Sequence, residues 1–195
     1  MAPEIRVPRA PWIAPAYTLL ELLMVVSLLS VLAAASWRVI TNDLHRSRLN
    51  AVGFDFTSWV ESIRKAAQTT QGGCEITVAN LSEAADGTQL ATVRNLNAND
   101  PPCTKNRPNF LFSAADANEK LSSQATASVI IFTPRGTILG AGSQALPDQV
   151  EVRLALQSIT QLRCIRLSGL LGALQIGSHS STANVATSCT TYARF

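Results

Sequence analysis

Cysteine is the residue type in this sequence with the clearest chemistry. The chain has four cysteines, at Cys74, Cys103, Cys164 and Cys189. Four cysteines allow three complete disulfide pairings, and the sequence alone does not choose rigorously among them. We favour the two pairs that close local loops and leave the predicted strands intact. These are Cys74 with Cys103 and Cys164 with Cys189.

The sequence carries no pattern for a cofactor or a catalytic centre. No C-x-x-C motif is present, and His45 and His179 are both far from any cysteine in the sequence, so a zinc site is not expected. The G-x-S-x-G, P-loop, H-E-x-x-H and G-x-G-x-x-G motifs are also absent. We therefore expect no metal, no cofactor and no enzymatic activity.

Arginine dominates the charge of the C-terminal part of the chain. Residues 135 to 195 contain Arg135, Arg153, Arg163, Arg166 and Arg194 against Asp148 and Glu151. Arginine binds phosphate well, and an aromatic ring such as that of Tyr192 or Phe195 can stack on a base. Nucleic-acid contacts are therefore a candidate role for Arg163, Arg166 and Arg194. The alternative, which we favour, is a mildly basic solvated face, because these arginines do not form a run.

The elements that position these residues follow from an uneven distribution of apolar residues. The chain has 195 residues, of which 47% are hydrophobic and 15% charged, and its formal net charge is +3. This composition excludes disorder, and the length suits one domain of ordinary size. Much of the apolar excess lies between Leu19 and Ile40, interrupted only by Glu21 and Arg38. Because about 20 apolar residues suffice to cross a bilayer, this segment can span a membrane.

The pattern predicts that one helix continues past the apolar segment. No proline occurs from residue 16 to residue 100, and Gly72-Gly73 is a credible stop. Apolar residues recur at steps of three and four, at Leu49, Val52, Phe56, Trp59 or Val60, Ile63 and Ala67. We expect a helix of about 53 residues whose first half lies in lipid and whose second half covers a protein core. Gly53 is a point at which it could bend.

Beyond Gly73 the pattern changes to the alternation typical of strands. Val150 to Leu156 alternates, and Ser128 to Thr133 is a β-branched run that ends at the turn Pro134-Arg135-Gly136. Further strands are predicted at Glu75 to Val78, Leu90 to Val93, Arg163 to Leu167 and Ala173 to Ile176. Residues 79 to 127 are expected to be long connections with weak strands. The predicted fold is α+β, with a long N-terminal helix packed on an antiparallel β-sheet.

The strand around Cys164 predicts the placement of the C-terminal tail. If Ile165 and Leu167 face the helix, Cys164 faces outward, because neighbouring residues of a strand point to opposite faces. A tail that carries Cys189 could be tied down there.

The segment around residue 17 resembles the processing site of type IV prepilins and type II secretion pseudopilins. A short basic leader ends at Ala16, and Tyr17, the sequence T-L-L-E-L-L and a continuous apolar helix follow. The resemblance implies that a prepilin peptidase cuts between Ala16 and Tyr17 on the cytoplasmic side and that Tyr17 is then N-methylated. Ala16 stands where the family nearly always has glycine. In the family, the glutamate that matches Glu21 is implicated in recruiting the subunit and in meeting the N-terminal amine of a neighbour.

A second, looser resemblance lies toward the C-terminus. The sequence from Phe132 to Thr137, the strand from Val150 and the segment from Arg163 to Ser168 look like the C-terminal domain of H-type pseudopilins and related minor pilins. The implied organisation is a leader at 1–16, a membrane-spanning and assembly half-helix at 17–43 and a periplasmic or extracellular domain at 44–195.

The two resemblances imply a structural subunit of a type IV pilus or a type II secretion-like filament. The implied partners are other pilin or pseudopilin subunits, the inner membrane, the assembly platform, and the prepilin peptidase and N-methyltransferase. The subunit would lie in the inner membrane before assembly and in a periplasmic or cell-surface filament afterwards. Because some minor pilins take part in DNA uptake, a DNA-binding minor pilin is the alternative.

Two other interpretations of the N-terminus stay open. A secretory signal peptide would use Arg6 and Arg9 as its basic region and would be cleaved after Ala35. A permanent single-span anchor of an unrelated periplasmic domain is the other. Against the signal peptide, Glu21 opens the apolar segment, and the helical pattern continues past Ala35.

Overall fold

The computed structural model describes residues 18–104, 107–115, 117–146, 149–168 and 172–194, with the backbone alone at 35–38 and 194. The chain divides into two compact units, Met1–Ile40 and Thr41–Phe195. The helix α1 (Leu19–Thr70) runs from the first unit into the second without interruption at Gly53. Its bounds are close to those that the sequence pattern predicts.

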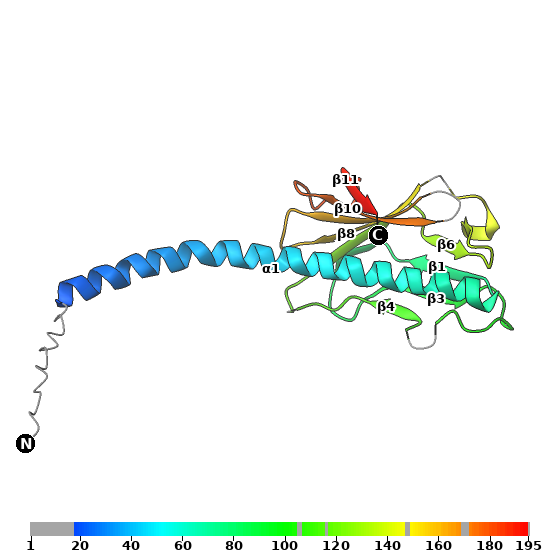
Figure 1. The fold of residues 1–195 in the computed structure, drawn as a ribbon, viewed down its shortest axis with the longest axis horizontal. Helices are drawn as coiled ribbons and strands as arrows, with labels where there is room; N and C mark the ends of the chain where they lie inside the picture. Colours follow the sequence, from blue (N-terminus) through cyan, green and yellow to red (C-terminus); the bar gives the residue numbers. More distant parts are fainter. Residues whose placement is uncertain (1–17, 105–106, 116, 147–148, 169–171, 195) are drawn as a thin grey trace, which may run out of the picture. The chain divides into compact units, whose positions relative to one another are not determined.

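The second unit combines the C-terminal part of α1 with two antiparallel sheets (Figure 1). Its strands are β1 (Cys74–Val78), β2 (Leu81–Ala84), β3 (Gln89–Asn95), β4 (Asn109–Leu111), β5 (Leu121–Ala125), β6 (Val129–Phe132), β7 (Ile138–Leu139), β8 (Gln149–Leu156), β9 (Leu162–Ser168), β10 (Ala173–His179) and β11 (Thr191–Arg194). A short 3₁₀ helix, η1 (Ala141–Ser143), lies between β7 and β8. The predicted α+β class, with a long N-terminal helix packed on antiparallel sheet structure, is confirmed.

The expectation of one sheet needs correction, because the strands divide into two. The five-stranded sheet has the order β4-β3-β1-β6-β7, and the six-stranded sheet has the order β11-β10-β9-β8-β5-β2. All pairings between these strands are antiparallel. The division arises because β1 pairs with β3 and β6, whereas β8 takes β5 from the middle of the chain as its other neighbour.

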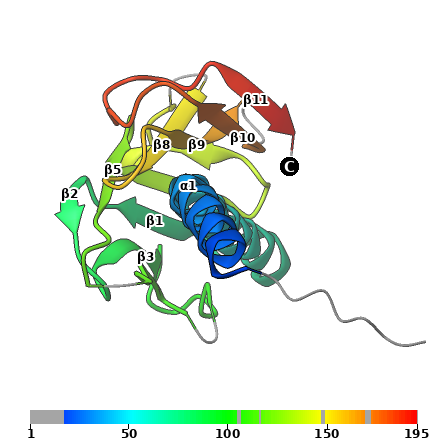
Figure 2. The same ribbon diagram turned by 90° about the vertical axis from the view of Figure 1, so that its left-hand side faces the viewer.

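The amphipathic part of α1 supplies the centre of the core, as its periodicity predicts. The buried residues of its stripe are Leu49, Phe56, Trp59, Val60, Ile63 and Ala67, and Val52 packs against them partly buried. They share one cluster with strand residues of both sheets, among them Ile76, Ile130, Leu154 and Ile165. Figure 2 shows β1 and β3 to the left of the helix and β8, β9 and β10 above it. Burial on two sides explains why so wide a stripe of this helix is apolar.

The predicted strands correspond to β1, β3, β6, β8, β9 and β10. The sequence pattern did not resolve β2, β4 and β5 within the segment expected to be mostly connections. β5 has the sequence LSSQA, in which Leu121 is the one large apolar residue, yet Leu121 and Ser123 are both buried. A buried serine satisfied by hydrogen bonds gives no hydrophobic alternation, so periodicity cannot detect such a strand.

The end of α1 differs in detail from the prediction that Gly72-Gly73 stops it. The helix ends at Thr70, and Gln71 takes the left-handed conformation with φ 56°. Gly73 is instead required for close packing, because a Cβ there would lie 2.8 Å from a side-chain carbon of Leu96. The two glycines therefore let the chain turn tightly into β1 beneath the following loop.

Candidate functional site

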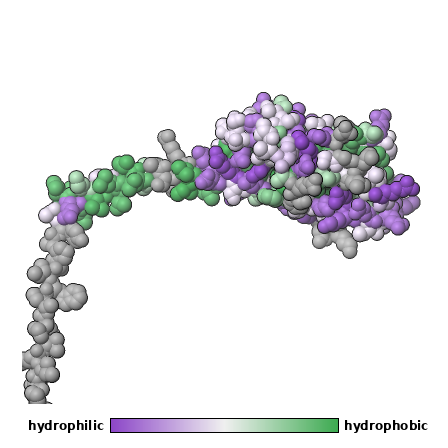
Figure 3. Space-filling model, turned by 45° about the horizontal axis from the view of Figure 1, so that its top comes forward, coloured by the Kyte–Doolittle hydropathy of each residue, from purple (hydrophilic) through white to green (hydrophobic). Residues whose placement is uncertain are grey.

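The described apolar side chains at the start of α1 are uncovered. Leu19 and Leu20 are each 77% exposed, and the exposed apolar surface continues through Met24, Leu29 and Leu32. Of the described residues, α1 contains the one helix long and apolar enough to cross a membrane, with mean hydropathy 2.3 in an 18-residue window that is 0% buried. Figure 3 shows this segment as hydrophobic surface, whereas the visible face of the second unit is largely hydrophilic. Such a helix must be covered by lipid or by other protein.

Glu21 lies in the first turn of this helix, where it belongs to a capping arrangement. The hydroxyl of Thr18 accepts a hydrogen bond of 3.2 Å from the backbone N–H of Glu21. The spacing T-x-x-E is that of a capping box, and a carboxylate is favoured by the helix dipole at this end. Glu21 also borders an apolar hollow of about 260 Å³ formed with Leu22, Val25 and Val26. The T-x-x-E pattern from Thr18 to Glu21 is the local sequence signal for this cap.

The processing residues Ala16 and Tyr17 lie outside the described residues, so the structure bears on neither. Glu21 is the one charged residue among positions 18 to 37. The chemistry available at this site is therefore burial of apolar surface together with a single carboxylate.

The four cysteines form two disulfides, Cys74–Cys103 and Cys164–Cys189, in the pairing favoured from the sequence. The first ties the start of β1 to the loop before β4. The second ties β9 to the C-terminal segment on the face of the six-stranded sheet that points away from α1. Cys164 and Cys189 form a separate small core there with Leu162 and Ala155, whereas Ile165 and Leu167 belong to the main core with α1.

A buried carboxylate organises the C-terminal segment on this outer face. Glu151 is 5% exposed and accepts hydrogen bonds from the hydroxyl of Tyr192, the backbone N–H of Cys189 and the guanidinium of Arg153. Arg153 also donates to the carbonyls of Val185 and Ala186. We call Glu151, Arg153 and Tyr192 the tail clamp. No local sequence pattern marks it, because Tyr192 lies 41 positions after Glu151.

The tail clamp shifts the ionisation of its members. Burial alone would raise the pKa of the Glu151 carboxyl, but the hydrogen bonds from Tyr192 and Cys189 and the charge of Arg153 outweigh it, so the pKa lies below its ordinary value. Burial, with the hydrogen bond and negative charge of Glu151, raises the pKa of Tyr192 to about 12. Glu151 is therefore an anion at neutral pH and Tyr192 a neutral hydrogen-bond donor.

Gly177 makes room for the tail clamp, and we expect Gly177→Ala to disrupt it. A Cβ at this position would lie 2.5 Å from Cε1 of Tyr192 and 2.9 Å from the carbonyl oxygen of Thr191. Such overpacking is expected to lower the free energy of unfolding by about 1 to 3 kcal/mol, measured by denaturant titration of the full chain in detergent. The matched control is Gly53→Ala, where the nearest atom would be 3.9 Å away and helix propensity favours alanine by up to about 1 kcal/mol. Equal stability of the two variants would contradict this prediction.

The three candidate nucleic-acid contacts are not brought together as one site. Arg163 lies toward α1, where its guanidinium donates to the side chain of Asn50, and burial lowers its pKa. Arg166 lies on the opposite face of β9, with its guanidinium carbon 3.3 Å from the ring centroid of Tyr192. Arg194 lies in β11 opposite Gln175, the residue that also faces Arg166 in the sheet register. Arg163 and Arg166 are thus engaged within the fold.

The arrangement of potential metal ligands among the described residues gives no free thiolate. Glu151, Cys164 and Cys189 place their ligand atoms within 4.8 Å of one another. The two sulfurs are bonded to each other, so they cannot act as thiolate ligands. Elsewhere, Nδ1 of His45 lies 3.9 Å from Oε1 of the buried Glu119, which links α1 to the loop before β5.

The described residues thus define an α+β protein with an uncovered apolar N-terminal helix and a disulfide-tied C-terminal segment. The chain matches no model of a known protein family, no curated protein and no solved structure.

Proposed function

We propose that this chain is a structural subunit of a type IV pilus or type II secretion-like filament, a minor pilin or H-type pseudopilin. The observation that carries the proposal is the division of one helix into two chemically different parts. Its first part exposes the large apolar side chains from Leu19 to Leu32, and its second part supplies the core of a folded unit. A subunit that is stored in a membrane and then polymerises requires this division, because the same apolar surface must be covered by lipid in one state and by protein in the other.

The processing site supplies the second line of support. In this proposal the prepilin peptidase cuts between Ala16 and Tyr17, the N-methyltransferase modifies Tyr17, and the assembly platform withdraws the helix from the inner membrane into the filament. The N-terminal residue of the mature protein separates the alternatives. Tyr17 agrees with the proposal, Ser36 would identify a cleaved signal peptide, and Met1 would identify a plain anchor.

Glu21→Ala tests the assembly role. We expect the variant to fold and to reach the membrane, because the Thr18 cap uses the backbone N–H of residue 21, but to be lost from filaments sheared from the cells. The measurement is the ratio of filament-bound to membrane-bound chain on an immunoblot, with at least a tenfold decrease expected. Asp43→Ala, which removes an exposed carboxylate from the same helix, is the control and should leave the ratio unchanged. Normal incorporation of Glu21→Ala would refute the assembly role.

A further inference from the structure

A groove runs along one side of α1 within the second unit, between the helix and the stretches 102–104 and 107–113. One hollow of about 490 Å³ is lined by Ser58, Trp59, Ser62 and Ala66 of the helix and by Pro102 and Cys103 opposite. A second hollow of about 240 Å³ is lined by Arg48, Ala51, Val52, Phe110 and Leu111. Asp55 and Arg107 line both hollows, so the two form one interrupted channel, which we call the outer groove.

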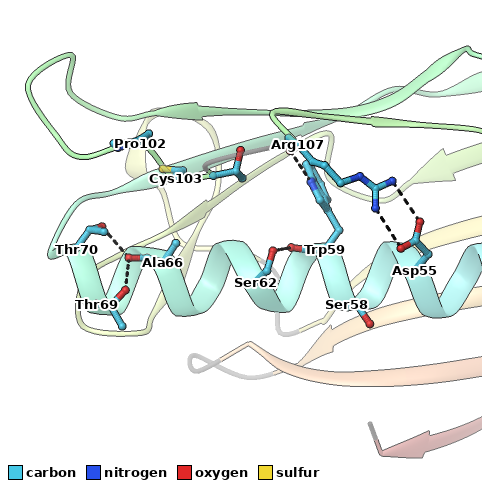
Figure 4. A pocket seen from close by; sticks show the side chains of 11 residues that line it. Asp55, Ser58, Trp59, Ser62, Ala66, Thr69, Thr70, Pro102, Cys103 and Arg107 are labelled. Atoms are coloured by element: carbon cyan, nitrogen blue, oxygen red, sulfur yellow. Dashed lines mark hydrogen bonds and ion pairs between the residues drawn. The ribbon is translucent and has the colours of Figure 1, made fainter.

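The wall of the outer groove is held in place. Cys103 is bonded to Cys74, and the indole N–H of Trp59 donates to the carbonyl of Arg107 at 2.9 Å. Figure 4 shows Arg107 reaching from this wall to Asp55 on the helix, with the paired atoms 3.4 Å apart. Both side chains are about half exposed, and exposed ion pairs contribute only about 0 to 1 kcal/mol. The wall is therefore preformed. The ion pair between Asp55 and Arg107, which separates the two hollows, can break at little cost in free energy.

The chain itself carries a segment that needs such a groove. The described apolar side chains from Leu19 to Leu32 are uncovered, and small residues of the groove such as Ala51, Ser58 and Ser62 allow a second helix to approach closely. Because the helix and the groove are different surfaces of one chain, their contact is heterologous. Repetition of a heterologous contact builds an open filament when the rotation between copies does not close into a ring.

The charges of the two surfaces are complementary. Glu21 is the one charged residue among positions 18 to 37. Arg48 is exposed, lines the second hollow and forms no ion pair with any other described residue. Both acidic residues that line the second hollow already have partners. Asp55 pairs with Arg107, and Glu119 accepts a hydrogen bond from the backbone N–H of Ala115.

We propose that the outer groove receives the apolar helix of a second copy of this chain, with Glu21 of one copy beside Arg48 of the other. The inference rests on the proposed function and names the partner surface used in assembly. With the two helices parallel, this register displaces the copies by about 40 Å of helical rise, at about 1.5 Å per residue.

Charge reversal tests the pairing in filaments sheared from cells that lack the wild-type chain. We expect Arg48→Glu and Glu21→Arg each to lower the filament-bound fraction at least tenfold, and the double variant to recover at least half of it. The matched control is Arg46→Glu, which reverses an exposed arginine that does not line the groove. The unfolding midpoint of each variant in detergent must stay within about 3 °C of the wild type, which excludes a general loss of folding.

Thiol crosslinking reports directly which residues of two copies lie close together, and it does not rely on reversing a charge. No free cysteine occurs among the described residues, so Leu22→Cys and Ala51→Cys introduced in one chain react specifically with a bismaleimide. A ladder of covalent multimers is expected for this pair, whereas Leu22→Cys with Ser82→Cys on β2 should give none.

The outcomes separate the two proposals. If Arg48→Glu assembles normally or the Leu22–Ala51 crosslink is absent, the groove assignment is wrong, and the loss of Glu21→Ala from filaments still supports the filament role. If Glu21→Ala assembles normally, the assembly role in the proposed function is refuted, and the groove assignment, which rests on it, is refuted as well.

Discussion

Phe56→Ala is expected to lower the free energy of unfolding by about 3 to 5 kcal/mol, the range for removing a fully buried aromatic side chain. Phe56 is 1% exposed, and its ring meets that of Phe110 edge-on, with 5.2 Å between the ring centroids. The ring of Trp59 lies 5.9 Å away on the same helix. Because the site is enclosed by α1 and the five-stranded sheet, the surroundings cannot collapse fully into the cavity.

Chemical denaturation of the full chain in detergent, followed by tryptophan fluorescence, measures this loss. Phe54→Ala is the matched control, since Phe54 lies on the same helix but is 50% exposed, and a change below about 1 kcal/mol is expected there. A similar loss for both variants would show that the periodic stripe does not define the core.

Glu151→Ala is the second change with a large expected effect, about 3 kcal/mol. It leaves Arg153, whose side chain is 11% exposed, without its carboxylate, and breaking a buried ion pair on one side costs about 3 to 5 kcal/mol. It also frees the hydroxyl of Tyr192 and the N–H of Cys189. Glu75→Ala is the control: Glu75 is also buried, at 7% exposed, but its partner Arg94 has a side chain that is 74% exposed and can return to water. We expect a loss of about 1 kcal/mol for the control, and equal losses would argue against the tail clamp.

The same carboxylate makes stability depend on pH. The folded-state pKa of Glu151 lies below its ordinary value, so the stability it contributes is present above the unfolded pKa of about 4.3 and is lost as the pH falls through the folded pKa. Glu151→Gln keeps the shape but does not titrate. The difference in unfolding free energy between wild type and Glu151→Gln should therefore shrink as the pH falls below the unfolded pKa of about 4.3, and a constant difference would count against the assignment.

The helix and strands whose apolar residues recur with a regular period were predictable from the sequence. The stripe from Leu49 to Ala67 recurs with the helical period, and strands such as β8 alternate over a long run, so both are visible without tertiary information. The division into two sheets was not, because it depends on β5, a serine-rich strand whose partner β8 lies far along the chain. Strand pairing at long range leaves no local signal.

The residues of the candidate site also divide into those that a local sequence pattern marks and those that it does not. Glu21 stood out in the sequence because a charge within an apolar segment is conspicuous. The groove and the tail clamp did not, since each joins residues from distant segments, such as Trp59 with Arg107 and Glu151 with Tyr192.

The packing of α1 on two sheets determines how the second unit bears mechanical load. The buried stripe from Leu49 to Ala67 spans about five helical turns. A pull along the helix axis acts on all of these turns in shear, so the contacts must slide together before the helix is released. A pull across the axis would instead separate them one turn after another. The unit is therefore stronger in tension along α1 than in any direction that peels the helix from the sheets.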